Sequence, residues 1–207
     1  MLPSFTPPAL ARIPIEDGLL FFCERWLPPE VTAAAFATLR AETPWRAEQI
    51  RIAGRLIDVP RRTAWYGDPG ATYVYSGLTN EPLAWTPLLA ELRAAVVTAA
   101  GAPLNAALLN FYRDGRDSMG WHADAEPELG KDPVVASLSL GAPRRFLLRH
   151  AKKKGKSMTF VLGDGALLVM AGSTQHHYRH SVPKEDEAGE RINLTFRRVL
   201  LPEERGK

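Results

Sequence analysis

The chain has 207 residues, of which 45% are hydrophobic and 24% are charged; this supplies enough apolar material for one large core and excludes wholesale disorder. Its single cysteine, Cys23, excludes a disulfide framework and fits a reducing compartment. No window reaches the roughly 18 apolar residues that span a bilayer, and the N-terminus lacks a signal-peptide pattern, so we expect a soluble cytoplasmic protein.

The N-terminal half has the pattern of mixed helix and strand. Proline at Pro29 and the capping residue Thr86 mark two helix starts, and Gly101 ends the second helix. The expected elements are, in chain order, an extended segment over residues 1–18, a helix over 30–40, a hairpin with a basic tip over 50–57, a short aromatic strand over 73–76 and a helix over 86–100.

From residue 106 onward, short strands alternate with turn residues. The expected strands cover residues 106–112, 134–140, 145–150, 158–162, 166–170, 176–182 and 191–200. This spacing indicates a β sandwich or barrel, so the fold class is α+β. We interpret the boundary near residue 102 as a change of layer within one structural unit, with residues 1–101 before it and residues 102–207 after it.

The formal net charge is only +3, but the positive charge is concentrated in two stretches. Residues 144–156 contain seven basic residues and no acidic one, and four arginines lie between residues 51 and 62. Local positive charge of this kind suits a polyanion such as nucleic acid, although a solvated surface hairpin explains residues 144–156 at least as well.

The pattern His122-x-Asp124 predicts part of a metal site. In an extended segment, residues two apart point to the same face, so these two side chains can hold one ion. A third ligand has to come from a distant strand, and His176, His177 and His180 are all available there. Two histidines and one carboxylate form the facial triad of non-haem iron(II) oxygenases, but zinc hydrolases use similar ligands, so the triad alone leaves the metal open.

The last expected strand carries a second polar face. With a period of two, Arg191, Asn193 and Arg197 share one face, while aliphatic and aromatic residues share the other. Asn110 and Tyr112 alternate in the same way in an earlier strand. Two guanidinium groups on one face are what a dicarboxylate requires, although an edge strand with polar residues facing water would show the same pattern.

Four motifs follow one another in order: Asn110-Phe-Tyr112, His122-x-Asp124, His180-Ser-Val-Pro183 and Arg191-Ile-Asn-Leu-Thr-Phe-Arg197. The ordered set resembles the AlkB family of iron(II)- and 2-oxoglutarate-dependent dioxygenases, over roughly residues 50–200, and looks closest to its branch that repairs double-stranded DNA. The resemblance implies a double-stranded β-helix (jelly-roll) core with an N-terminal helix and hairpin lid for nucleotide recognition. It also implies that His180, rather than His176 or His177, is the third metal ligand beside His122 and Asp124.

The same resemblance implies roles for ten further residues. For 2-oxoglutarate, Arg191 would bind the distal carboxylate with help from Tyr112 and Asn193, and Arg197 and Asn110 would lie near the metal-binding end. The positions that match residues around a flipped base are Arg61, Tyr73, Tyr75, Ser76 and Glu126. The π faces of the two tyrosines would favour a cationic methylated base.

One position departs from the duplex-repair branch, which inserts an aromatic residue from a hairpin into the base stack. Here that position is Ala53, with Ile52 beside it. Either Ile52 acts as a smaller wedge or the protein prefers single strands, because extruding a base costs least where it is already unpaired.

The resemblance implies oxidative demethylation of N-alkylated bases, of the 1-methyladenine and 3-methylcytosine type, in DNA. Iron(II), O2 and 2-oxoglutarate would be consumed together with the substrate, and formaldehyde, succinate and CO2 released. Nucleic acid is the expected partner, and we expect a monomer. The alternatives are an AlkB-like hydroxylase or demethylase of RNA or protein, a non-catalytic nucleic-acid-binding module and a zinc-dependent hydrolase.

Overall fold

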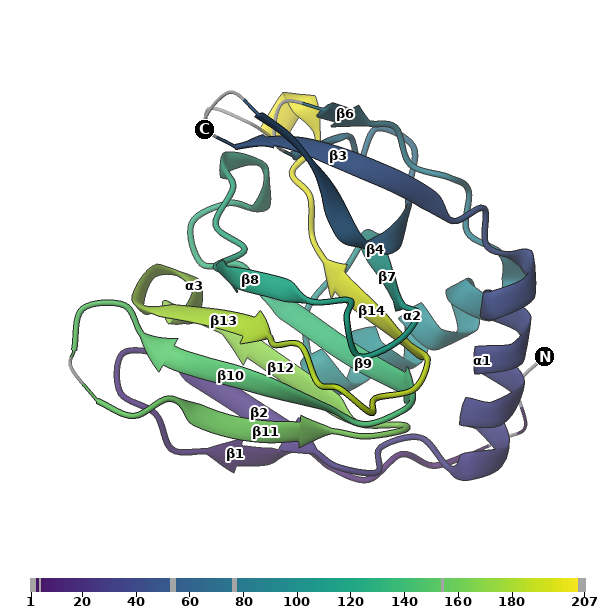
Figure 1. The fold of residues 1–207 in the computed structure, drawn as a ribbon, viewed down its shortest axis with the longest axis horizontal. Helices are drawn as coiled ribbons and strands as arrows, with labels where there is room; N and C mark the ends of the chain where they lie inside the picture. Colours follow the sequence, from purple (N-terminus) through teal and green to yellow (C-terminus); the bar gives the residue numbers. More distant parts are fainter. Residues whose placement is uncertain (1–2, 4, 53–54, 76–77, 154, 205–207) are drawn as a thin grey trace.

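The computed structural model describes residues 3, 5–52, 55–75, 78–153 and 155–204, and for residues 50–52, 55, 73–75 and 78–80 it describes the backbone alone. Two β-sheets face each other, and helices cover the outer face of the larger sheet (Figure 1). The larger sheet has eight strands in the order β1 (Ala11–Ile13), β2 (Leu19–Cys23), β12 (Leu167–Ala171), β9 (Val135–Gly141), β14 (Arg191–Arg197), β7 (Ala106–Tyr112), β4 (Arg55–Gly67) and β3 (Arg46–Ile52). The smaller sheet has four strands in the order β11 (Met158–Leu162), β10 (Arg144–His150), β13 (Tyr178–Val182) and β8 (Met119–His122).

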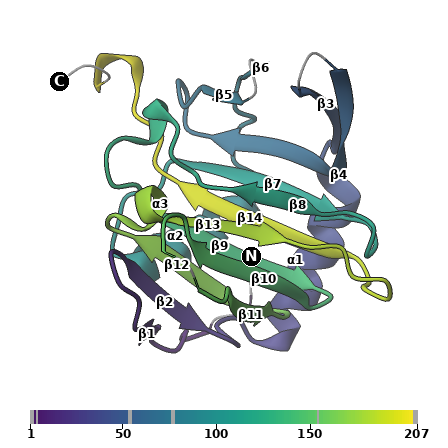
Figure 2. The same cartoon turned by 60° about the vertical axis from the view of Figure 1, so that its left-hand side comes forward.

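The remaining elements lie around these two sheets. They are the helices α1 (Pro29–Glu42), α2 (Pro87–Ala100) and α3 (Thr174–His177), the 3₁₀ turns Pro127–Leu129 and Pro202–Glu204, and the small ladder of β5 (Tyr73–Tyr75) with β6 (Leu78–Asn80). The strand pairs within both sheets are antiparallel, as in a jelly roll (Figure 2). The predicted α+β class with a double-stranded β-helix core is therefore confirmed.

Among the described residues, two of the three apolar clusters lie on opposite faces of the larger sheet. On the outer face, Val31 of α1 and Leu92 of α2 pack with Ile192, Leu194 and Phe196 of β14. The second core lies between the two sheets and is built from Leu20, Val135, Phe146, Leu148, Leu168 and Met170, among others. Since successive residues of a strand point to opposite faces, the odd-numbered residues of β14 point between the sheets.

Helix α2 begins and ends where the sequence predicts, whereas α1 starts one residue before and ends two residues after the expected range of 30–40. Thr86 caps α2 by accepting a hydrogen bond from the backbone N–H of Leu89 at 3.2 Å, and Gly101 ends the helix with a φ of 62°. Pro29 is the first residue of α1. None of the helices in the described part of the chain is long and apolar enough to cross a membrane.

Most of the predicted strands are confirmed, but the strand expected over residues 176–182 is wrong at its start. The backbone N–H groups of His176 and His177 bond to the carbonyl of Ser173, which makes the short helix α3, and the strand begins only at Tyr178. The last strand ends at Arg197 rather than at residue 200. Strands β2, β6 and β8 were not predicted as elements, and β1 lies within the segment expected to be extended. The hairpin expected over residues 50–57 is the tip of the longer β3–β4 hairpin. Strands from both sides of residue 102 lie in the eight-stranded sheet.

Candidate metal centre and dicarboxylate pocket

Three side chains converge where β8 and β13 lie side by side. His122 ends β8, Asp124 follows it in the next loop, and His180 pairs with His122 across the β8–β13 ladder. The two imidazole centroids are 4.1 Å apart, and His122 Nε2 lies 3.9 Å from Asp124 Oδ1. Each of the three residues offers one ligand atom, and these atoms all lie within 4.8 Å of one another, which is close enough to hold one metal ion.

The contacts of the two imidazoles suit metal binding. His122 Nδ1 lies 2.9 Å from the carbonyl oxygen of Gly120, which can only accept, so the ring proton is on Nδ1 and Nε2 keeps its lone pair. His180 is 5% exposed, stacks on Phe146, and its buried Nδ1 has no hydrogen-bond partner among the described residues. Burial, together with His122, lowers the pKa of His180 to about 3, so its ring is neutral at pH 7.

The carboxylate is kept ionised and oriented by its neighbours. Burial would raise the pKa of Asp124, but the positive charge of Arg197, whose Nη2 lies 3.4 Å from Oδ2, lowers it below its ordinary value. The backbone N–H of Asp124 donates to Oε1 of Gln175 at 3.0 Å, and Gln175 is only 2% exposed. Sequence reasoning missed Gln175, because nothing in its local pattern links it to a loop 51 residues away.

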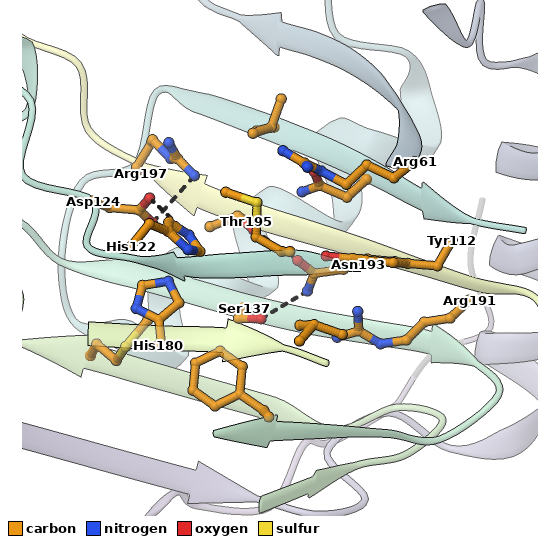
Figure 3. A pocket seen from close by; sticks show the side chains of 16 residues that line it. Arg61, Tyr112, His122, Asp124, Ser137, His180, Arg191, Asn193, Thr195 and Arg197 are labelled. Carbon is orange, nitrogen blue, oxygen red and sulfur yellow. Dashed lines mark hydrogen bonds and ion pairs between the residues drawn. The ribbon is translucent and has the colours of Figure 1, made fainter. Parts of the chain in front are cut away.

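A pocket extends from this triad between the two sheets, with the triad and Arg197 at one end and Arg191 and Tyr112 at the other (Figure 3). Arg191 is 1% exposed, and its only donor with a partner among the described residues is Nη2, which bonds to Ser139 Oγ at 2.9 Å. Its Nε and Nη1 are buried without a partner there, and burial lowers the pKa of its guanidinium. A buried cation with unused donors requires an anionic partner, and a carboxylate is the group that fits a guanidinium fork.

The central position of β14 decides between the two interpretations of its polar face. It lies between β9 and β7, and all seven of its residues are buried, including Arg191, Asn193 and Arg197. The alternative of an edge strand with polar residues facing water is therefore wrong. A zinc hydrolase is also disfavoured, since its chemistry has no use for a buried arginine pair.

The two asparagines line the pocket but hold other side chains. Asn110 Oδ1 accepts from Arg61 Nε at 2.7 Å. Asn193 Nδ2 donates to Ser137 Oγ at 2.8 Å, and Asn193 Oδ1 accepts from Thr195 Oγ1 at 2.9 Å. Direct contact of Asn110 or Asn193 with a cosubstrate stays a prediction, and in this structure both order the polar wall of the pocket.

Of the residues expected around a base, the structure describes the side chains of two. Arg61 lines the same pocket as the metal triad and is 4% exposed. Glu126 lines a neighbouring cavity, and its buried Oε2 has no hydrogen-bond partner among the described residues. The side chains of Tyr73, Tyr75 and Ile52, and the residues Ser76 and Ala53, lie outside what the structure describes.

A second cluster of possible ligands, Asp17, His150 and His177, does not suit a metal. His150 Nδ1 accepts hydrogen bonds from the backbone N–H groups of Lys152 at 3.1 Å and Lys153 at 3.0 Å, so its ring proton is on Nε2, which faces Asp17 Oδ2 at 3.4 Å. Asp17 Oδ2 also accepts from Lys153 Nζ at 2.7 Å. A protonated nitrogen and a carboxylate already paired with an ammonium group are poor ligands, so we interpret this cluster as an ion-paired turn.

Comparison with known proteins agrees with this geometry. The sequence profile of the 2OG-Fe(II) oxygenase superfamily matches residues 20–197, so the chain belongs to that superfamily. The human protein named DNA oxidative demethylase ALKBH2 is 40% identical over 74% of this chain and 62% of its own length. The alpha-ketoglutarate-dependent dioxygenase alkB homolog 3 of Rattus norvegicus is 37% identical over 98% of this chain and 69% of its own length. Within the superfamily, the chain is a member of the AlkB family of dioxygenases.

The fold of this chain is also similar to that of a solved structure. The structure of OsALKBH1 superposes with a TM-score of 0.67 over 91% of this chain and 100% of that chain, at 16% identity. The chain spans less than two thirds of the length of human ALKBH2.

Iron(II) and 2-oxoglutarate are the metal and cosubstrate of this superfamily, and the side chains present fit both. Two imidazoles and a carboxylate leave three coordination positions open, as iron(II) oxygenases require. At the far end of the same pocket, Nε and Nη1 of Arg191 have no partner among the described residues, so they are donors that a carboxylate of a dicarboxylic acid would fit.

Proposed function

We propose that this protein is a DNA repair dioxygenase that removes methyl groups from N-alkylated bases such as 1-methyladenine and 3-methylcytosine. The observation that carries the proposal is the single pocket that joins a His-Asp-His triad to the buried Arg191. The choice of DNA is supported by relatives named DNA oxidative demethylase, which are 36% to 40% identical to this chain.

The chain's own residues supply binding and orientation. His122, Asp124 and His180 would hold iron(II), and Arg191, assisted by Tyr112, would bind the distal carboxylate of 2-oxoglutarate. When bound, iron(II) and 2-oxoglutarate let O2 oxidise the N-methyl group, which leaves as formaldehyde while the cosubstrate becomes succinate and CO2. The protein contributes placement of the two substrates and exclusion of water from the space between the sheets.

An exposed basic surface on the outer face of the smaller sheet, whose inner face carries His122 and His180, suits a phosphate backbone. Arg149 and Arg179 lie directly opposite each other on β10 and β13, and neither has an ion-pair partner among the described residues. The guanidinium carbon of Arg149 lies 4.0 Å from the ring centroid of Trp121, the residue before His122. Two like charges side by side are unfavourable in the free protein, and a bound phosphate would relieve their repulsion without reading sequence.

The tip of the basic hairpin is less suited to this role. Lys153 Nζ lies 2.5 Å from Glu16 Oε2 and 2.7 Å from Asp17 Oδ2, so its charge is already paired. We therefore place the phosphate contacts of the smaller sheet on Arg149 and Arg179 rather than on Lys153.

The test supplies the purified chain with iron(II), 2-oxoglutarate and oligonucleotides containing 1-methyladenine or 3-methylcytosine, as single-stranded DNA, duplex DNA and RNA. We expect formaldehyde release from DNA, and Asp124→Ala should abolish it while leaving the fold intact. Turnover of RNA alone, or of no oligonucleotide while a peptide supports succinate formation, would replace the proposal by one of its two enzymatic rivals. Near-normal rates in Asp124→Ala would contradict the ligand assignment.

A further inference from the structure

Arg144 is a buried arginine next to the dicarboxylate end of the pocket that the proposed chemistry does not use. It begins β10 and is 1% exposed. Its guanidinium donates to three backbone carbonyls from two separate loops: Nη1 to Asp114 at 3.2 Å, and Nη2 to Asp117 at 2.8 Å and to Pro183 at 2.7 Å. A planar fork can satisfy several carbonyls at fixed angles, which an ammonium group cannot do.

Arg144 also shares an aromatic ring with Arg191. The guanidinium carbons of Arg144 and Arg191 lie 5.5 Å and 5.2 Å from the centroid of the Tyr112 ring. The β9–β10 turn explains this proximity, because Gly141 pairs with Arg191 across the β9–β14 ladder and Arg144 follows three residues later. Two cations therefore hold the Tyr112 ring: Arg191, which lines the pocket, and Arg144, which does not.

The two loops that Arg144 holds are in close backbone contact with each other. The N–H of Glu185 donates to the carbonyl of Gly115 at 2.9 Å, and a Cβ added at Gly115 would lie 1.5 Å from the carbonyl oxygen of Glu185. Glu185 Oε1 in turn lies 3.5 Å from Arg144 Nε and 3.6 Å from Arg145 Nε. Arg144 and Arg145 thus share one carboxylate, but only Arg144 reaches the Tyr112 ring.

We propose that Arg144 is a positioning residue for the cosubstrate site: by fixing the two loops and the Tyr112 ring, it holds Arg191 so that Nε and Nη1 face the distal carboxylate. The proposal rests on the proposed use of Arg191 for 2-oxoglutarate. Arg144 does not itself line the pocket and reaches it only through the Tyr112 ring, so we expect its effect on binding of the cosubstrate and not on the later chemistry.

The experiment measures the dissociation constant for 2-oxoglutarate by calorimetry on the iron(II)-loaded full chain, without oxygen and without nucleic acid. Arg144→Met is expected to weaken binding by about 10-fold to 100-fold, the range usual for residues that orient binding groups, and to raise KM for 2-oxoglutarate with little change in kcat. The matched control is Arg145→Met, which removes the other, half-exposed partner of Glu185 and is expected to leave binding unchanged.

Coupling through the ring is tested with Tyr112→Leu. If Arg144 acts through Tyr112, then Arg144→Met adds less than about twofold in the Tyr112→Leu background. Fully additive losses, or unchanged binding in a folded Arg144→Met protein, would overturn the proposal. If circular dichroism shows that Arg144→Met is unfolded, Arg144→Lys decides, because it keeps the charge but loses the three-carbonyl geometry and should still weaken binding. A wild-type chain that does not bind 2-oxoglutarate would instead overturn the proposed function.

Discussion

Replacing Arg191 by Met should keep or raise the stability of the ligand-free protein but lower its affinity for 2-oxoglutarate. Arg191 is a fully buried cation whose Nη2 donates to Ser139 Oγ at 2.9 Å, while its Nε and Nη1 have no partners among the described residues. Burying an unpaired charge costs several kcal/mol, which outweighs one hydrogen bond of about 1 kcal/mol and one cation–π contact of about 1 kcal/mol. We therefore expect the ligand-free variant to be as stable as the wild type or more stable by about 1 kcal/mol, which is a rise in Tm of roughly 2–4 °C.

Binding should change in the other direction. Removing one partner of a buried, hydrogen-bonded charge pair costs about 2–5 kcal/mol, so the affinity of Arg191→Met for 2-oxoglutarate should fall by about 30-fold to 5,000-fold. Thermal unfolding with and without the cosubstrate measures both effects. At about 100 times the wild-type Kd, 2-oxoglutarate should stabilise the wild type by about 2.7 kcal/mol and the variant by less than about 1 kcal/mol. The exposed Arg145→Met is the control. A variant that loses several degrees of Tm yet keeps the cosubstrate-induced shift would refute this reasoning.

Three further predictions test the surroundings of the site. Burial would raise the pKa of Asp117, but three hydrogen bonds from Arg113 lower it. Ionised Asp117 therefore stabilises the folded state above the unfolded pKa of about 3.9, and this contribution is lost as pH falls through the lower folded pKa. Asp117→Asn should therefore lose about 1–2 kcal/mol in urea unfolding at pH 7, and a difference that stays the same at pH 3 would contradict this cause. Gln175→Ala should weaken iron(II) binding by about 10-fold to 100-fold in anaerobic titrations, because Asp124 loses its backbone acceptor, and unchanged affinity would remove Gln175 from the site. Arg149→Met should weaken binding to undamaged DNA and reduce the slope of log affinity against log salt by about one, while an unchanged slope would move the phosphate contact elsewhere.

The alternation of polar and apolar residues in the last strand was enough to predict that one face is polar, but not that this face is buried. Arg191 and Arg197 alternate with Ile192, Leu194 and Phe196, which face the other way, whether the strand is central or at an edge. Burial comes from neighbours on both sides, β9 and β7, and pairing between distant strands is not encoded in a local period. Only the order of strands in the sheet could therefore distinguish a buried dicarboxylate-binding face from an edge strand that faces water.

The third metal ligand shows a similar limit. Spacing alone left His176, His177 and His180 equivalent, and the resemblance to a family was needed to choose His180. The structure gives the physical reason: His176 and His177 belong to the short helix α3 and not to the strand, whereas strand pairing places His180 opposite His122. Gln175 and Arg144 could not be found from sequence, because their importance depends on contacts 51 and 27 to 39 residues away.

An anaerobic titration of the chain with iron(II) in the presence of 2-oxoglutarate tests the metal site directly, because a charge-transfer absorption band appears when a 2-oxo acid chelates iron(II). We expect the band to saturate at one iron per chain and to be lost in His180→Ala, while His150→Ala behaves like the wild type. A band that persists in His180→Ala, or that depends on His150, would show that the metal is held somewhere else.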